Sequence, residues 1–204
     1  DLSLITGGGV RVDRLAACFD AGLSRANLSI HGWSPVAFIA RTGRGAKMWQ
    51  HRQDNLQLLL DQGRFLKLNY VWCGPQDDED LGALLDWAAD QPVVVGVLDD
   101  LGDPALGPKV IQQALFRVRG APEHRRAEPD PHSLPTLRLR WADGLEVEVK
   151  DHHLGEVAPW SSCDACPVRQ QCREGIHALR LSHDGMLRPC MDRPDLNLDL
   201  RSIL

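Results

Sequence analysis

Residues 65–100 read FLKLNYVWCGPQDDEDLGALLDWAADQPVVVGVLDD, and the expected fold follows from their pattern. Residues 65–73 are rich in β-branched and aromatic side chains, and residues 93–100 are rich in valine, which predicts two strands. Between them, residues 77–90 predict a helix whose first turn is acidic, where the helix dipole stabilises negative charge. A strand, a helix and a second strand in this order indicate a parallel pair of strands joined by a crossover helix.

The same alternation extends toward the N-terminus. Residues 2–6 and 26–30 are expected to be strands, and residues 11–22 and 48–63 are expected to be helices that end at Gly22 and Gly63. Repeated β-α units predict an α/β fold with a parallel sheet covered by helices. Because such crossovers are right-handed, we expect the sheet to curl into a whole or partial (β/α) barrel.

The pattern changes after residue 98. Residues 99–109 are predicted to be a loop and residues 109–120 a short helix, whereas residues 121–135 contain four prolines and are expected to be a linker. Residues 136–151 alternate apolar and polar side chains on both sides of Ala142-Asp143-Gly144, which predicts a hairpin. We therefore expect three parts: residues 1–120 in the barrel, the linker 121–135, and a small antiparallel, cysteine-bearing domain over residues 136–204.

Four of the six cysteines lie close together near the C-terminal end, with the spacing C-x2-C-x5-C-x17-C. Cys163, Cys166 and Cys172 come from one loop, and Cys190 ends a predicted hairpin that turns at residues 183–185. Four thiolates can hold Zn²⁺ or ligate a [4Fe–4S] cluster, and the spacing alone leaves both open. A disulfide framework is less expected, because the length and uneven cysteine placement favour a reducing compartment. Cys18 and Cys73 are isolated and are expected to be small core residues.

Composition excludes several classes of function. The chain has 204 residues and a net charge of −5, so a general nucleic-acid-binding surface is not expected. No apolar run reaches the roughly 18 residues of a membrane-spanning helix, and no signal peptide opens the chain. A cytoplasmic location without membrane attachment is the expectation.

Three short motifs occur in the order found in one enzyme family. They are Ile5-Thr6-Gly7-Gly8, Asn27-Leu28-Ser29-Ile30-His31-Gly32 and Lys67-Leu68-Asn69. With this order and spacing, the first half resembles the barrel of radical S-adenosylmethionine (radical SAM) enzymes. The segment LRLSHDGMLRPC (179–190) resembles the end of the cyclase that begins molybdenum-cofactor synthesis. The C-x2-C-P-x4-C spacing of Cys163, Cys166 and Cys172 resembles the SPASM/twitch extensions of peptide-modifying members.

The resemblance implies two cofactors. An auxiliary [4Fe–4S] cluster would be ligated by Cys163, Cys166, Cys172 and Cys190, and S-adenosylmethionine would contact Thr6, Ser29, Lys67 and Asn69. The reaction would generate a 5′-deoxyadenosyl radical that takes hydrogen from a peptide, nucleoside or small metabolite. An electron donor such as flavodoxin or ferredoxin would supply the electron. The alternative interpretation is a non-catalytic protein with a structural zinc knot.

Several of these residues also have simpler interpretations. Thr6 is equally expected as an ordinary strand-ending threonine, His31 as a surface residue, and Lys67 as the partner of an internal acid. His152 and His153 can ligate metals but are expected to be spare beside four cysteines. Arginines around the cysteine hairpin would bind an anionic substrate or offset the charge of a cluster; they are Arg180, Arg188 and Arg193.

The sequence also departs from the family. The C-x3-C-x2-C triplet that holds the catalytic cluster and the glycine-rich SAM motif do not occur in residues 1–204. We expect both to lie upstream of Asp1, so this chain alone is not expected to cleave S-adenosylmethionine. The molybdenum-cofactor cyclase uses three auxiliary cysteines and leaves one iron open, whereas four are present here. Its arginine- and glycine-rich tail is also absent, which argues against GTP as the substrate.

Overall fold

The computed structural model describes residues 2–99, 105–129, 134–155, 160–167, 169 and 178–202. The chain divides into two compact units. The first comprises Asp1–Arg126 and Arg138–Val149, and the second comprises Ala127–Leu137 and Lys150–Leu204. Each unit is described by itself.

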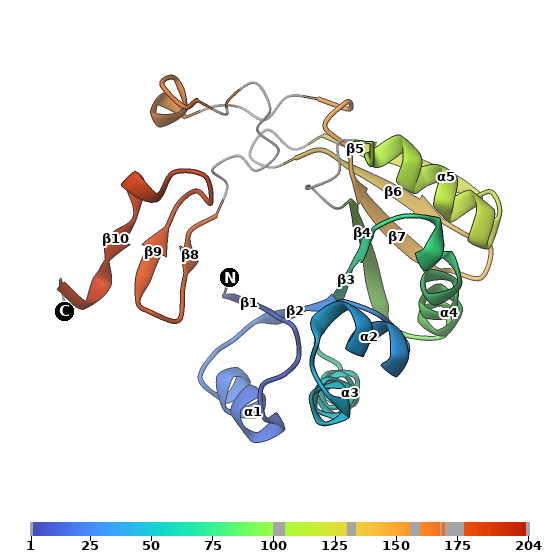
Figure 1. Cartoon of the computed structure of the whole chain (residues 1–204), viewed down its shortest axis with the longest axis horizontal. Coiled ribbons are helices and arrows are strands. Elements are labelled where there is room, and N and C mark those ends of the chain that lie inside the picture. The colour runs from blue at the N-terminus through green and yellow to red at the C-terminus, as the bar shows by residue number, and fades with distance from the viewer. Residues whose placement is uncertain are drawn as a thin grey trace. The chain divides into compact units, whose positions relative to one another are not determined.

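The first unit is built on a parallel sheet. Strands β1 (Ser3–Thr6), β2 (Arg25–Ile30), β3 (Leu66–Trp72) and β4 (Val93–Asp99) lie side by side in sequence order, and all three neighbouring pairs are parallel (Figure 1). The predicted parallel α/β arrangement is therefore confirmed. The order of the strands follows from crossover helices that each return the chain to the next position in the sheet.

Five helices accompany these strands: α1 (Val12–Asp20), α2 (Pro35–Thr42), α3 (Ala46–Asp61), α4 (Asp78–Ala89) and α5 (Pro108–Arg119). Figure 1 shows them on the outer side of the strands. Helix α2 was not predicted, although Ser34 caps it by accepting a hydrogen bond from the Ala37 N–H and Gly43 ends it in a left-handed conformation. No described helix has both the length and the apolar character needed to cross a membrane.

The core lies between the helices and one face of the sheet. Alternate residues of β2, β3 and β4 are buried, as the period of two in a strand requires. Leu28, Leu68 and Val95 are completely buried, and helix residues such as Leu59 and Leu84 cover them from the other layer. On the opposite face, β2 and β3 carry half-buried polar residues such as Asn27, Ser29, Lys67 and Asn69, whereas β4 contributes Val94, Gly96 and Leu98.

The predicted hairpin is present, but it belongs to the large sheet. Strands β6 (Thr136–Arg140) and β7 (Glu146–Lys150) extend the sheet in the order β1-β2-β3-β4-β7-β6-β5, and β7 pairs in parallel with β4. The reason is that buried Val147 and Val149 continue the apolar face of β4. The expected linker 121–135 also differs from the structure, because it contains strand β5 (His124–Glu128).

The sheet is open in the described part of the chain. Strand β1 forms one edge and β5 the other, and the described strands pair only with their neighbours in this order. A mostly parallel α/β sheet is thus established, whereas the barrel remains a prediction. A short 3₁₀ helix, Pro75–Asp77, connects β3 to α4.

The second unit contains a small antiparallel sheet of three strands, β8 (Arg180–Leu181), β9 (Met186–Arg188) and β10 (Leu198–Asp199). The predicted turn between β8 and β9 is confirmed, with Gly185 at positive φ and its N–H bonded to the Ser182 carbonyl. Among the described residues of this unit, 3₁₀ helices cover Ser161–Cys163, Pro194–Leu196 and Leu200–Ser202.

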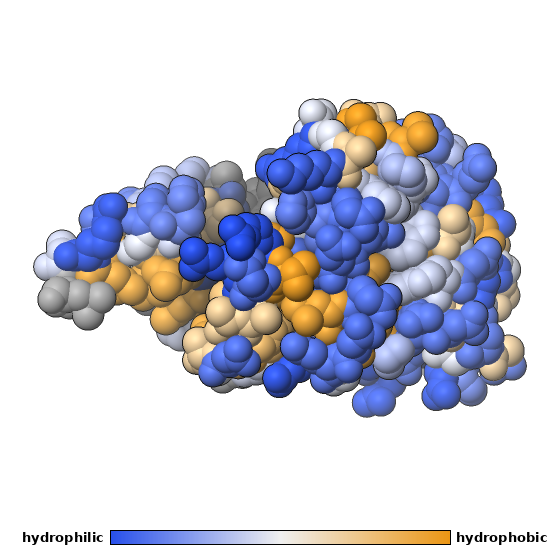
Figure 2. All heavy atoms as spheres, turned by 90° about the horizontal axis from the view of Figure 1, so that it is seen from below, coloured by the Kyte–Doolittle hydropathy of each residue, from blue (hydrophilic) through white to orange (hydrophobic). Residues whose placement is uncertain are grey.

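Some large apolar side chains of the first unit remain exposed, including Leu2, Ile5, Val36, Ile39 and Phe65. Figure 2 shows apolar side chains (orange) interspersed with polar ones (blue) on the face seen from below. Exposed apolar residues scattered in this way are ordinary on protein surfaces and do not define a site by themselves.

Candidate functional site

Three of the predicted cofactor-binding residues share the polar face of the sheet. Ser29 on β2 lies in register with Asn69 on β3, and Asn69 with Gly96 on β4. Residues in register point to the same side of a sheet, and Lys67 lies two positions before Asn69 on that side. The structure therefore brings Ser29, Lys67 and Asn69 together across neighbouring strands.

Lys67 already has a protein partner on this face. Its Nζ lies 2.5 Å from Oε2 of Glu148 on β7, and the other carboxylate oxygen accepts a hydrogen bond of 2.7 Å from Arg138. The simpler interpretation of Lys67, an ion pair with an internal acid, describes this arrangement. Glu148 was missed because it is 81 residues away in the sequence and is brought near by the pairing of β4 with β7.

Gly96 makes this ion pair possible. Strand β4 separates β3 from β7, so the Lys67 side chain must cross it to reach Glu148. A Cβ atom at position 96 would lie 2.9 Å from Cε of Lys67 and 2.8 Å from Oδ1 of Asn69. Glycine leaves this space open for the ammonium group, whereas a larger residue would require the side chains of Lys67 and Asn69 to shift.

Thr6 lies elsewhere. It is in register with Leu28, whose side chain is in the core, so it does not share the face of Ser29 and Lys67. Its hydroxyl accepts a hydrogen bond of 3.2 Å from the Gly8 N–H. Thr6 instead lines a cavity of about 530 Å³ at the carboxyl ends of β1 and β2, together with His31 and side chains of α2 and α3. Ligands of α/β folds bind at this end of the strands.

The cavity is positively charged. Arg41 and Arg44 line it, and Arg41 is held in place by an ion pair with Asp77 and a 2.7 Å hydrogen bond to the Val71 carbonyl. The pKa of His31 is lowered, first by its partial burial and then by the charges of nearby arginines (Arg41, Arg44 and Arg52). An anionic group is the ligand that this lining favours.

Two buried polar side chains of α3 hold the loops around the cavity, and neither was predicted from the sequence to have this role. Asn55 donates hydrogen bonds to the carbonyls of Gly8 (2.8 Å) and Val10 (2.6 Å). Arg52 donates to the carbonyls of Gly32 and Trp33, and its burial lowers its pKa to about 10. The feature of the sequence that could have identified Arg52 and Asn55 is their position among the buried residues on an otherwise apolar face of α3.

Gly8 accommodates this packing. It has a φ of 73°, and a Cβ atom there would lie 2.8 Å from Cγ of Arg52. The positive φ and the short distance to Arg52 each favour glycine at this position. The Gly-Gly sequence after the first strand is thus explained by the close approach of α3.

The cysteines lie in the second unit, where three of the four are described; Cys172 lies outside the described residues. Cys163 and Cys166 occupy successive tight turns, in which the Cys166 N–H bonds to the Cys163 carbonyl at 3.0 Å. Cys190 is buried and directly follows the β8–β9 hairpin. None of the described cysteines forms a disulfide.

Arg193 connects the two cysteine-bearing segments. It follows Cys190 by three residues and donates a 2.6 Å hydrogen bond to the carbonyl of Ser162, next to Cys163. Asp195 holds its guanidinium through two hydrogen bonds of 2.7 and 2.6 Å. The pKa of Arg193 is raised, mainly by Asp195 and further by the side chain of Cys166. This arginine therefore places a positive charge beside the cysteine loop.

The described cysteines, Cys163, Cys166 and Cys190, do not form a compact group of three ligands. In a tetrahedral Zn²⁺ site with bonds of about 2.3 Å, the sulfur atoms lie roughly 3.8 Å apart. Within the described residues, one group of three or more potential ligands has its donor atoms within 4.8 Å, and it contains no cysteine. A cluster of four irons is larger than one ion, so its ligands stand farther apart. Soft thiolate donors, one of them buried, fit such a cluster.

The chain is similar to curated enzymes along its whole length. It is 28% identical over 214 residues to the GTP 3′,8-cyclase of Nostoc sp., 25% identical over 220 residues to that of Picosynechococcus sp., and 28% identical over 214 residues to that of Trichormus variabilis. Each alignment covers 100% of this chain and 60% of the relative, so the chain spans three fifths of their length. No family model matches the chain.

These relatives confirm the resemblance to radical SAM enzymes that the motifs at Thr6, Ser29 and Lys67 suggested, and to the molybdenum-cofactor cyclase group that residues 179–190 suggested. They give no support to the zinc-knot alternative. The ligands of the auxiliary cluster and the residues that contact S-adenosylmethionine are not established by this similarity and stay predictions.

Proposed function

We propose that this chain forms part of a radical SAM enzyme and holds an auxiliary [4Fe–4S] cluster through Cys163, Cys166, Cys172 and Cys190. The observation that carries the proposal is the bridge from Arg193 to Ser162, because it joins the loop of Cys163 and Cys166 to the segment that follows Cys190. Similarity to GTP 3′,8-cyclases over the whole chain supports the same assignment.

The cluster would supply an iron site for electron transfer or substrate binding. The protein's own residues would hold the cluster and offset part of its charge. The cysteine thiolates hold the irons, and burial of Cys190 keeps water from that side. Arg193 offsets part of the negative charge that thiolates bring and keeps the loop close to the hairpin.

We further propose that S-adenosylmethionine is held by Thr6, Ser29, Lys67 and Asn69. The cavity supports the part proposed for Thr6, since Arg41 and Arg44 line it and supply positive charge for the carboxylate of the methionine part. Ser29, Lys67 and Asn69 are not among its lining residues, and their contacts would lie on the polar face, where Lys67 is paired with Glu148. Asn69 and Ser29 offer an amide and a hydroxyl on the polar face of the sheet. The substrate would be a small molecule or a peptide, and a flavodoxin or ferredoxin would be the electron donor.

The cluster assignment is tested by anaerobic reconstitution with iron and sulfide. The wild-type chain should be brown and bind about four irons, as a Cys₄-held cluster does. The variants Cys163→Ala, Cys166→Ala and Cys190→Ala should lose most of this iron. Cys18→Ala serves as the matched control, because Cys18 lies on α1 in the other unit.

Two results would contradict the proposal. One is a colourless protein that contains about one zinc and no iron. The other is equal iron content in Cys166→Ala and Cys18→Ala. Far-UV circular dichroism of each variant separates loss of ligands from loss of fold.

A further inference from the structure

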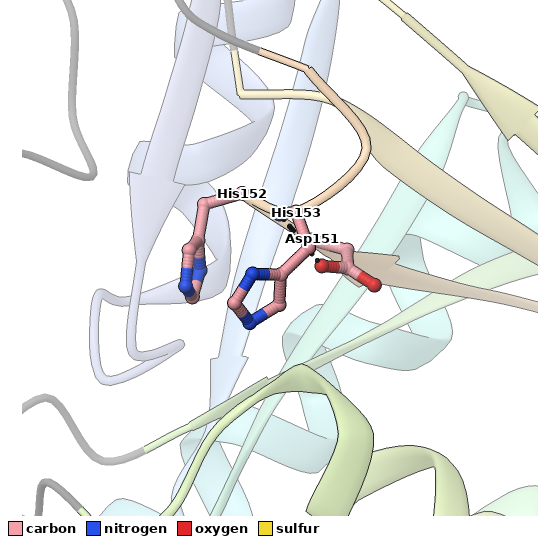
Figure 3. Close-up of side chains that lie close together, drawn as sticks. All are labelled: Asp151, His152 and His153. Carbon is pink, nitrogen blue, oxygen red and sulfur yellow. Dashed lines mark hydrogen bonds between the residues drawn. The ribbon is translucent and has the colours of Figure 1, made fainter.

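A second group of metal-binding side chains lies outside the cysteine segment. Asp151, His152 and His153 follow strand β7 directly, and each offers one donor atom such that all three lie within 4.8 Å of one another. Figure 3 shows both imidazole rings and the carboxylate gathered on one turn. The three residues belong to one unit of the protein.

The backbone holds this turn in a defined conformation. The Asp151 N–H donates to the Pro135 carbonyl at 2.9 Å, and the Leu154 N–H donates to the Asp151 carbonyl at 3.1 Å. The carboxylate of Asp151 accepts a 3.0 Å hydrogen bond from the His153 N–H. Asp151 is only 5% exposed, so its carboxylate is fixed where the chain leaves the sheet.

The two imidazoles lie side by side. Their ring centroids are 4.0 Å apart with a 43° tilt, His152 is half-buried and His153 is exposed. Imidazole nitrogen and carboxylate oxygen bind Zn²⁺ at about 2.0–2.2 Å, which places tetrahedral ligands roughly 3.3–3.5 Å apart. Small side-chain rotations would bring donors that now lie within 4.8 Å to that spacing.

An ionised carboxylate has two oxygens with about four lone-pair positions, so it can accept hydrogen bonds, such as the one from the His153 N–H, and bind an ion at the same time. That same hydrogen bond orients the ligand, as interactions around bound metals commonly do. The negative charge of Asp151 also lowers the cost of holding a cation beside two neutral histidines.

We propose that Asp151, His152 and His153 form a binding site for Zn²⁺ or a similar divalent transition-metal ion. Three protein ligands leave at least one coordination position for water or another ligand. The donor set is nitrogen and oxygen, in contrast to the sulfur donors of Cys163 and Cys166, so the two sites differ in the metals they select. The proposal does not depend on the iron–sulfur cluster.

The test is a Zn²⁺ titration of the full chain, followed by isothermal titration calorimetry and by NMR of the histidine imidazole nitrogens. Zn²⁺ added beyond the amount that the thiolates take up should shift the signals of His152 and His153. His152→Gln and His153→Gln should each weaken the binding at least about tenfold. His183→Gln, at an exposed histidine in the β8–β9 turn, is the matched control and should bind as the wild type does.

Unmoved His152 and His153 signals would overturn the proposal, since the zinc would then sit on thiolates alone. Equal affinity in His152→Gln and His183→Gln would overturn it as well. Iron content after reconstitution, measured on the same variants, should stay at the wild-type value, which separates failure of this site from failure of the cysteine site.

Discussion

Replacing Glu148 by glutamine tests the ion pair on the polar face of the sheet. The substitution keeps the shape of the side chain and removes its charge. The ammonium of Lys67, now 2.5 Å from the carboxylate, and the guanidinium of Arg138, 2.7 Å away, would both lose this partner. We expect the free energy of unfolding to fall clearly.

The size of the effect follows from burial. Removing one member of a buried ion pair costs about 3–5 kcal/mol, because the other charge stays buried without compensation. The side chains of Lys67 and Glu148 are 20% and 14% exposed, and Arg138 keeps Glu146 at 3.5 Å. Partial access to water lowers the expected loss to about 2–3 kcal/mol. For a chain of this length, that corresponds to a drop in Tm of roughly 4–12 °C.

The measurement is urea unfolding followed by far-UV circular dichroism, with the m-value compared between variants. Glu146→Gln is the matched control on the same strand. Glu146 is 33% exposed and contacts Arg138 at 3.5 Å, so its loss should cost at most about 0.5 kcal/mol. The double variant Lys67→Met, Glu148→Gln should be more stable than Glu148→Gln alone, because no unpaired ammonium remains.

The reasoning is refuted if Glu148→Gln and Glu146→Gln differ by less than about 0.5 kcal/mol, a value typical of exposed pairs. It is equally refuted if the Lys67→Met change lowers the stability of Glu148→Gln further. Either result would mean that the polar face is open enough to water for these charges to act independently.

Three further changes test other parts of the structure. Gly96→Ala should destabilise the chain by about 1–3 kcal/mol in urea, because the new Cβ displaces Lys67; stability equal to the wild type would contradict this contact. His31→Gln should flatten the pH dependence of stability below about pH 6.5. The pKa of His31 is lowered by its burial, so the unfolded state binds the proton first and the wild type loses stability as the pH falls below that value; identical pH profiles would exclude that role. Asn55→Ala should cost about 1–3 kcal/mol and raise the exchange rate of amides near Gly8, and unchanged hydrogen exchange there would show that the loop is held by other contacts.

The parallel α/β core was predictable because its signals are local. Strand residues such as those of β3 alternate between the core and the polar face, and the helices end at glycines or carry acidic first turns. The hairpin over residues 136–151 was predicted for the same reason. Its place in the sheet was not, because pairing with β4 depends on an apolar face that only the assembled sheet presents.

The cysteine site likewise has features that the sequence predicts and features that only the folded structure shows. The spacing of Cys163, Cys166 and Cys190 identified potential ligands without the structure, since chemistry and spacing are properties of the chain. The contact of Arg193 with the loop at Ser162 spans 31 residues and depends on how the segments fold together.

Sequence alone thus determined which residues can form strands, helices and ligands, because these properties depend on near neighbours. Tertiary structure decided that Lys67 reaches Glu148 through the space at Gly96, and that Arg193 bonds to the carbonyl of Ser162. The physical reason is that side-chain charges and donor atoms act over a few ångströms, and only the folded chain brings distant residues within that range.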